Sequence, residues 1–246
     1  MPIEIRARDI EIMKFVYKYR VATYPQIRQR IFMGSNGSAP RDRIRKLCNH
    51  GFLKSLSLNL DKDFLRGVRT TEKSWPYIKH TFGFEIERPH FKSESIHHDV
   101  RLVEIGQRFE KLKLYDEFLT ENLLQSSDYL TTHLLFKEAV GIRSDGVLSL
   151  KGHEGSQFVY AIELEVSKKS PERYRSKLNS YYQTLGLDGV IYICGDTQIK
   201  QAIERADREV STNRKSIVYL GLEEDVMGHT KKLIFYNKDG DGIGLY

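Results

Sequence analysis

The feature that most constrains the fold is a strand-like run over residues 158–166, FVYAIELEV, in which strict alternation is combined with paired acids. Because alternate residues of a strand point to opposite faces, one face would carry only apolar side chains, and Glu163 and Glu165 would share the other. Two residues apart on a strand, the two carboxylates would lie roughly 7 Å from each other. Either solvent screens these like charges or a divalent metal ion binds beside them, and the run alone leaves both explanations open.

The residues that surround this run alternate between segments typical of helices and of strands. Ser170 is a predicted N-cap, followed by Pro171 at the first helical position. The predicted elements, in chain order, are a helix over 95–112, a strand over 114–125, a strand that carries Asp145, the run above, helices over 170–187 and 197–210 with a buried strand over 189–196 between them, and a last core strand over 216–225. This order predicts a mixed sheet flanked by helices, an α/β domain of the mixed α+β kind over residues 95–246. The segment NKDGDGIG (237–244) predicts a hairpin turn rather than a calcium loop.

The first 94 residues differ in charge and are predicted to form a separate domain. They carry 19 Lys and Arg against 10 Asp and Glu, a net charge of +9, whereas residues 95–246 carry 20 against 23, a net charge of −3. Helical spacing predicts three helices, the second capped by Thr23, and a hairpin and a further short helix follow. This order predicts a winged helix-turn-helix over residues 1–94, with its third helix in the major groove of double-stranded DNA. A plain three-helix bundle with a solvated basic face is the alternative.

The candidates for DNA contact are basic side chains of the predicted third helix and hairpin. They are Arg41, Arg43, Arg45, Lys46 and Arg69. The sequence does not distinguish those that would contact bases from those that would contact phosphates.

The order of the second domain, together with its acids, resembles the core of the PD-(D/E)xK nucleases. In that family an Asp on one strand is followed by an acid-x-Lys pattern on the next. Asp145 and Glu163 match the first two positions, and the third position holds Glu165 instead of Lys. This departure leaves a degenerate, inactive site as an alternative.

Nearly the whole chain also resembles the replication-relaxation family of plasmids and integrative elements, which is similar to relaxases of the restriction-endonuclease-like type. The segments that carry the resemblance follow the winged helix and are HHDVRLVEI, LTENLL, RSDGVLSL, FVYAIELEVSKKS and YRSKLNSYY. The resemblance implies a metal-dependent DNA endonuclease or nickase of a mobile element (plasmid, phage or integrative element), acting at an origin or element end. The alternatives are an inactive, sequence-specific DNA-binding protein that marks an origin or regulates transcription, and an assembly protein that dimerises through its sheet.

Cleavage of a phosphodiester needs an activated water and stabilisation of the charge on phosphorus, and carboxylates that hold Mg²⁺ or Mn²⁺ supply both. We therefore expect Asp145 and Glu163 to be metal ligands, and Glu165 to be a ligand or to position the attacking water. Glu121, on the preceding predicted strand, is expected to complete the site, with Glu104 as its competitor.

The lysine that the family pattern places on the strand has two candidate replacements. Lys168 follows Glu165 closely, and Lys177 lies on the next predicted helix, one turn before Tyr181. Similarity to a KLxxY pattern in the family favours Lys177 and Tyr181 as residues that line the site, where Lys177 would stabilise developing charge. The alternative is an exposed Lys177 and a core Tyr181. The segment IHHD (96–99) is expected at a helix start or facing DNA, not at a metal.

The sequence predicts a cytoplasmic protein. No apolar run approaches the 18 residues of a membrane span, the first residues contain no signal-peptide core, and Cys48 and Cys194 have no metal-type spacing. A second copy of the chain and other mobilisation or replication proteins are the remaining candidate partners.

Overall fold

The computed structural model describes residues 3–34, 38–60, 63–88, 95–228 and 232–246. The chain forms two compact units, Met1–Glu104 with Gln125–Tyr129, and Ile105–Leu124 with Leu130–Tyr246. Helix α5 (Ile96–Phe109) contributes residues to both units, because the first unit extends to Glu104 and the second begins at Ile105. The predicted boundary, between residues 94 and 95, lies just before this helix instead of within it. Within the described ranges, no helix combines the length and the apolar character that a membrane crossing requires.

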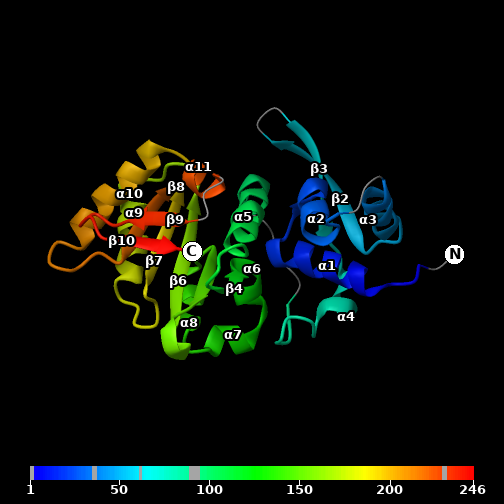
Figure 1. Cartoon of the computed structure of the whole chain (residues 1–246), viewed down its shortest axis with the longest axis horizontal. Helices are drawn as coiled ribbons and strands as arrows, with labels where there is room; N and C mark the ends of the chain where they lie inside the picture. Colours follow the sequence, from blue (N-terminus) through cyan, green and yellow to red (C-terminus); the bar gives the residue numbers. More distant parts are fainter. Residues whose placement is uncertain (1–2, 35–37, 61–62, 89–94, 229–231) are drawn as a thin grey trace. The chain divides into compact units, whose positions relative to one another are not determined.

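The first unit consists of helices and a small antiparallel sheet, whose hairpin is visible in Figure 1. Its elements are α1 (Ala7–Tyr19), β1 (Ala22–Thr23), α2 (Tyr24–Ile31), α3 (Ala39–Asn49), β2 (Leu53–Leu60), β3 (Asp63–Thr70), the 3-10 turn η1 (Glu72–Ser74) and α4 (Trp75–Ile78). The strands lie in the order β1-β3-β2. Helices, hairpin and short closing helix therefore follow one another as the sequence predicts.

Local signals explain where these helices begin and end. The hydroxyl of Thr23 accepts a hydrogen bond from the backbone N–H of Gln26, and the Gln26 side chain accepts one from the Thr23 N–H, which is a capping box. Gly51 follows α3 with φ +76°, a conformation that glycine adopts without steric cost. The inner faces of α1 and α3 bury Ile12 and Leu47 completely, whereas Cys48 is half-buried.

The second unit is a mixed sheet of seven strands in the order β10-β9-β8-β7-β6-β5-β4. The pairs β6–β7 and β7–β8 are parallel and the others are antiparallel. The sheet curls, and the backbone N–H of Leu114 at one end donates to the carbonyl of Tyr246 at the other, at 3.1 Å. Its elements are β4 (Tyr115–Thr120), α6 (Glu121–Ser126), α7 (Asp128–Thr132), α8 (Lys137–Ile142), β5 (Gly146–Lys151), η2 (His153–Gly155), β6 (Gln157–Glu165), α9 (Pro171–Tyr181), β7 (Gly189–Cys194), α10 (Thr197–Val210), β8 (Val218–Leu222), α11 (Glu223–Met227), β9 (Leu233–Tyr236) and β10 (Gly242–Leu245). The end of α6 and the start of α7 belong to the first unit.

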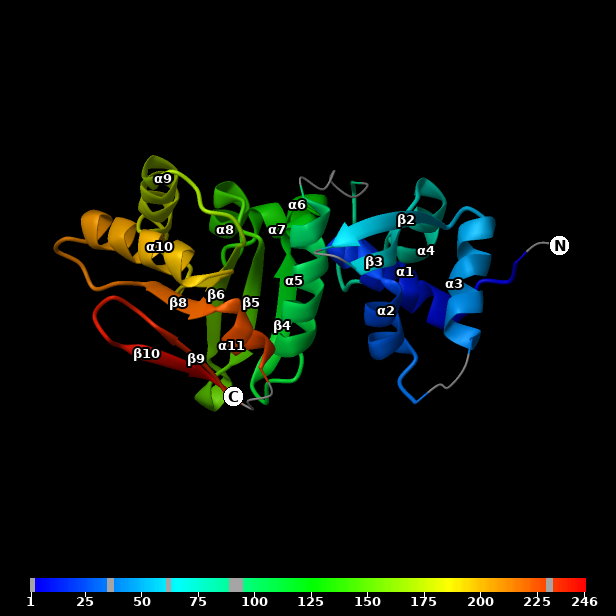
Figure 2. The ribbon, with the colours of Figure 1, turned by 90° about the horizontal axis from the view of Figure 1, so that it is seen from above.

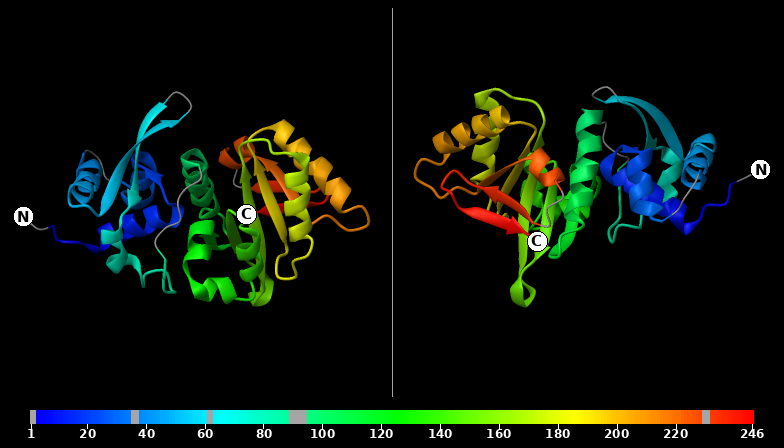
Figure 3. Two further views of the ribbon diagram at one scale, coloured as in Figure 1. Left: turned by 180° about the vertical axis from the view of Figure 1, so that it is seen from behind. Right: turned by 45° about the horizontal axis from the view of Figure 1, so that its top comes forward.

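Helices cover both faces of this sheet. α9 and α10 lie side by side on one face (Figures 2 and 3), where Ala161 and Tyr192 belong to the same buried cluster as Leu178 of α9. On the other face the ring of Phe109, at the end of α5, meets the ring of Phe118 edge-on, with centroids 5.4 Å apart. The strand run is therefore covered on both faces, which is typical of a central strand in an α/β sheet.

Two predicted strands end earlier than expected. The prediction of one strand over 114–125 is wrong because β4 ends at Thr120 and Glu121 begins a helix. Leu119, Leu123 and Leu124 are all buried. Their spacing is compatible with a helix and with a strand, so the apolar pattern did not distinguish the two. The strand predicted over 216–225 ends at Leu222 and is not the last, since β9 and β10 follow it.

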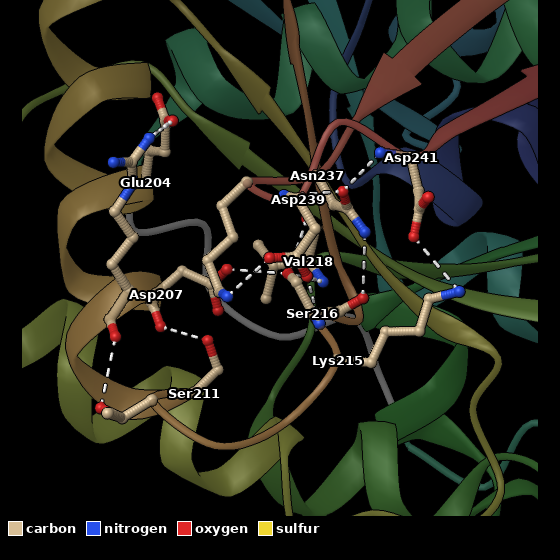
Figure 4. A network of polar contacts seen from close by, with 12 residues as sticks. Glu204, Asp207, Ser211, Lys215, Ser216, Val218, Asn237, Asp239 and Asp241 are labelled. Atoms are coloured by element: carbon tan, nitrogen blue, oxygen red, sulfur yellow. Dashed lines mark hydrogen bonds and ion pairs between the residues drawn. The ribbon is translucent and has the colours of Figure 1, made fainter.

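The segment 237–241 is the turn of the β9–β10 hairpin, as predicted. The side-chain oxygen of Asn237 accepts hydrogen bonds from the backbone N–H groups of Asp239 and Asp241, at 3.0 and 2.8 Å. Figure 4 shows that the turn is also tied to Ser216, whose N–H donates to Asp239 and whose hydroxyl donates to the buried Asp207. The turn therefore binds Ser216, which precedes β8 and is itself hydrogen-bonded to Asp207 of α10.

Candidate functional site

The predicted acids come together where β6 ends, beneath α9. Glu163 and Glu165 are the last residues of β6 on the face that α9 covers, and Asp145 directly precedes β5, the antiparallel neighbour of β6. The negative charge of Asp145 acts on both glutamates, because it contributes to raising the pKa of each. Asp145 and the pair of glutamates, which lie on separate segments of the chain, thus share one end of the sheet.

Glu163 is buried, with 5% of its surface exposed, so solvent screening does not explain its charge. Its Oε2 atom accepts a hydrogen bond from the ammonium group of Lys177 at 2.6 Å, and its Oε1 atom accepts one from the hydroxyl of Tyr181. Burial raises the pKa of Glu163 to about 7, Lys177 opposes this increase, and Asp145 adds to it. Burial therefore outweighs the attraction of Lys177 in setting the pKa of Glu163.

Lys177 and Tyr181 both reach Glu163 from α9, one helical turn apart, but their environments differ. The side chain of Lys177 is 31% exposed, while Tyr181 is completely buried. Burial would lower the pKa of Lys177, yet the charges of Glu163, Asp145 and Glu165 raise it overall. Burial holds the pKa of Tyr181 well above its usual value. Lys177 is thus a cation at the edge of the acidic cluster, and Tyr181 lies behind it.

Asp145 and Glu165 are half-buried. One carboxylate oxygen of Asp145 accepts a hydrogen bond from the backbone N–H of Leu164 at 2.8 Å, which fixes the side chain beside β6. The ammonium group of Lys169 lies 3.3 Å from a carboxylate oxygen of Glu165. Burial raises the pKa of Glu165, Lys169 lowers it, and Asp145 raises it further. Each glutamate of the pair therefore has its own lysine.

The remaining candidates for the site are Glu121, Lys168 and Glu104, and their surroundings differ from those of Glu163 and Glu165. A carboxylate oxygen of Glu121 accepts a hydrogen bond from Nε of Arg143 at 3.2 Å, and its backbone N–H donates to the carbonyl of Asp145. Lys168 is exposed, so Lys169 is the lysine of this loop that meets an acid. Glu104 belongs to the first unit, where it accepts a hydrogen bond from Gln26 at 3.2 Å.

A divalent metal fits the chemistry of the acidic cluster. Carboxylate oxygens are the donors that Mg²⁺ and Mn²⁺ prefer, and Mg²⁺ is usually held by only one or two carboxylates, with waters and substrate phosphates as further ligands. Asp145 and Glu163 offer two such groups. Over the described ranges, no three or more His, Cys, Asp or Glu side chains are grouped so that together they could hold a metal ion. The donor set thus suits an ion that a substrate phosphate helps to hold.

Four residues near the acids were missed in the sequence. Ser144 is completely buried, and its hydroxyl oxygen lies 2.7 Å from that of Tyr181. Arg143 adopts the left-handed conformation (φ 59°, ψ 54°) after α8, which turns the chain into Asp145. The hydroxyl of Tyr192, in register with Glu163, is buried and has no hydrogen-bond partner within the part of the chain that the structure describes. Of these four residues, only Lys169 could have been recognised in the sequence, because it is a basic residue four positions after Glu165.

The basic residues predicted to contact DNA divide into two groups. Arg41, Arg45 and Lys46 are exposed on α3, whereas Arg43 is held by Asp9 of α1, through its Nε atom at 2.7 Å. Although burial raises the pKa of Asp9, the hydrogen bond from Arg43 contributes to lowering it overall. Arg43 therefore stabilises the packing of α3 on α1.

Two further predicted residues lie outside α3. Arg69 is half-buried on β3 and pairs in register with Lys54 of β2. In the segment predicted to begin a helix or to face DNA, Asp99 is in the first turn of α5 but is buried, 3.5 Å from the guanidinium of Arg20. Asp99 therefore lies at the helix start, one of the two positions expected for this segment, and its buried side chain does not face outward.

Comparisons of the chain with models of protein families, with curated proteins and with solved structures give no match.

Proposed function

We propose that this chain is a metal-dependent DNA endonuclease or nickase of a mobile element, acting at an origin or element end. Its first unit would be a winged-helix DNA-binding domain, and its second a PD-(D/E)xK-like nuclease domain. The observation that carries the proposal is the meeting of Asp145, Glu163 and Lys177 at the carboxyl end of β6. Lys177, a residue of α9, would supply the positive charge that β6 lacks, because Glu165 stands where the PD-(D/E)xK pattern has its lysine.

The proposed roles follow from position and charge. When bound, Mg²⁺ or Mn²⁺ would act as a Lewis acid on the scissile phosphate and on a water molecule. Asp145 and Glu163 would hold that ion with their oxygens. The ammonium group of Lys177, which is partly exposed, would stabilise negative charge on the phosphate. Glu165 would orient the attacking water and accept its proton, since its raised pKa makes it a better base than an ordinary glutamate.

DNA binding is proposed for the first unit, in the cytoplasm and on double-stranded DNA. Support comes from the order of three helices and a hairpin and from the exposed Arg41, Arg45 and Lys46 on the third helix. In a winged helix-turn-helix this helix enters the major groove. Phosphate contacts by these side chains would make the affinity fall with increasing salt concentration.

A second candidate function is an inactive DNA-binding protein that marks an origin or regulates transcription. The observation that favours it is the state of Glu163, both of whose oxygens are engaged, by Lys177 and by Tyr181. In this alternative the ion pair would replace the metal site and would serve only the stability of the second unit.

The test is a cleavage assay on supercoiled plasmid that carries the DNA next to the gene. The protein is incubated with Mg²⁺, with Mn²⁺ or with EDTA, beside an Asp145→Ala variant. Metal-dependent conversion to open circles that the variant lacks supports the nickase. A gel shift that weakens with salt, without cleavage under any condition, supports the inactive DNA-binding protein. Absence of both would contradict the two proposals and leave assembly through a second copy of the chain.

A further inference from the structure

We infer that Ser144 and Tyr181 are positioning residues, which hold the carboxylate of Glu163 in one orientation through a buried chain of hydroxyl groups. The inference rests on the proposed function, because it assigns these residues a role at the same site. Neither hydroxyl would touch DNA or metal. They act through Glu163 alone.

The chain of contacts runs inward from the acid. The hydroxyl of Tyr181 donates to Oε1 of Glu163 and lies 2.7 Å from the hydroxyl of Ser144. Ser144 and Tyr181 are both 0% exposed, so water does not compete for these hydrogen bonds. If Tyr181 donates to the carboxylate, the Ser144 hydroxyl is left to donate to Tyr181, which gives the chain a single direction.

Fixing Oε1 also fixes the second oxygen. A carboxylate has two oxygens in one plane, so an Oε1 atom that is held toward the interior leaves Oε2 on the side of Lys177, at 2.6 Å from its ammonium group. Rotation of the carboxylate would break both contacts in a buried site, where a polar group left without a partner is destabilising. Oε2 is therefore the oxygen presented to any cation at this site.

Ser144 is well suited to link this chain to the neighbouring acid. It directly precedes Asp145, whose carboxylate is fixed by the N–H of Leu164, the residue after Glu163. A displacement of Ser144 would thus move Asp145 as well as Tyr181. The two proposed metal ligands are held relative to each other by adjacent residues of one turn.

The second unit contains a matched control. Tyr192 is a buried tyrosine in register with Glu163, but its hydroxyl makes no hydrogen bond to any residue that the structure describes. Tyr192→Phe removes the same atom as Tyr181→Phe from the same hydrophobic cluster, without removing a contact to the carboxylate. The comparison separates positioning from the general effect of deleting a buried hydroxyl.

The experiment compares the wild type with Ser144→Ala, Ser144→Thr, Tyr181→Phe and Tyr192→Phe. For each protein we would measure the Mn²⁺ affinity by titration calorimetry, the kcat and KM of plasmid nicking, and the melting temperature. We expect Tyr181→Phe to weaken Mn²⁺ binding by about 10-fold or more, the usual effect of removing a group that orients a metal ligand. Nicking should lose kcat while the KM for DNA is unchanged. Ser144→Ala should show a smaller loss, Ser144→Thr should restore it, and Tyr192→Phe should match the wild type.

A wild type that binds Mn²⁺ and nicks, with Tyr181→Phe indistinguishable from Tyr192→Phe, overturns the inference and leaves the proposed function intact. A wild type that neither binds Mn²⁺ nor nicks removes the proposed function and the positioning role together. The ¹³C resonance of the Tyr181 ring carbon that bears the hydroxyl then reports on the hydrogen-bond chain alone. It should shift in Ser144→Ala, and an unshifted resonance would refute the chain itself.

Discussion

Replacing Glu163 by glutamine should change how the stability of the protein depends on pH. Burial raises the pKa of Glu163 from 4.5 to about 7 in the folded protein, despite the nearby Lys177. The folded state therefore binds this proton more tightly than the unfolded chain, and the resulting stabilisation is complete below pH 4.5 and is lost as pH rises through 7. At about 1.4 kcal/mol per pKa unit, the shift corresponds to about 3 kcal/mol.

Urea unfolding followed by circular dichroism, in EDTA at pH 5, 6, 7 and 8, measures this effect. The free energy of unfolding of the wild type should fall by about 2.5 kcal/mol relative to Glu163→Gln between pH 5 and pH 8, because at pH 5 the unfolded chain has already lost most of this proton. Glu172→Gln on the exposed side of α9 is the control. The pKa of Glu172 is lowered, chiefly by hydrogen bonding at the start of the helix, so its charge does not change in this pH window. Parallel curves for the wild type and Glu163→Gln would refute the reasoning that a buried, titrating carboxyl lies under α9.

Further predictions concern the cations of each unit. Lys177→Met should raise the pKa of Glu163 above its present value, because the nearest positive charge is removed, and an infrared band of the protonated carboxyl should persist to higher pH. Plasmid nicking at pH 7 should fall at least about tenfold in the same variant, since Lys177 is the cation proposed to stabilise the phosphate; unchanged nicking would rule out that role. Arg45→Ala should weaken DNA binding without changing the melting temperature and should lower the slope of log affinity against log salt by about 1. Arg43→Ala should instead lower the melting temperature, because it leaves the carboxylate of Asp9 buried without its guanidinium partner; an unchanged melting temperature would contradict this assignment.

The elements that the sequence predicted well are those whose signals are local. Thr23 caps α2 and Ser170 caps α9, each through hydrogen bonds within a few residues. The turn at 237–241 is equally local, since Asn237 bonds to the backbone two and four residues ahead. Where local signals were ambiguous, as at Glu121, the apolar spacing suited a strand and a helix alike, and the strand prediction was wrong.

By itself the sequence determined the order of most helices and strands and the shared face of Glu163 and Glu165. It also indicated Asp145 and Lys177 as candidate residues of the site. Only the tertiary structure decided that α9 covers that face, so that Glu163 is buried between Lys177 and Tyr181, with Ser144 behind them. It also decided that Arg43 binds Asp9 instead of facing outward with Arg45. The physical reason is that caps and alternation depend on neighbouring residues, whereas burial and ion pairing depend on which distant segment packs against a side chain.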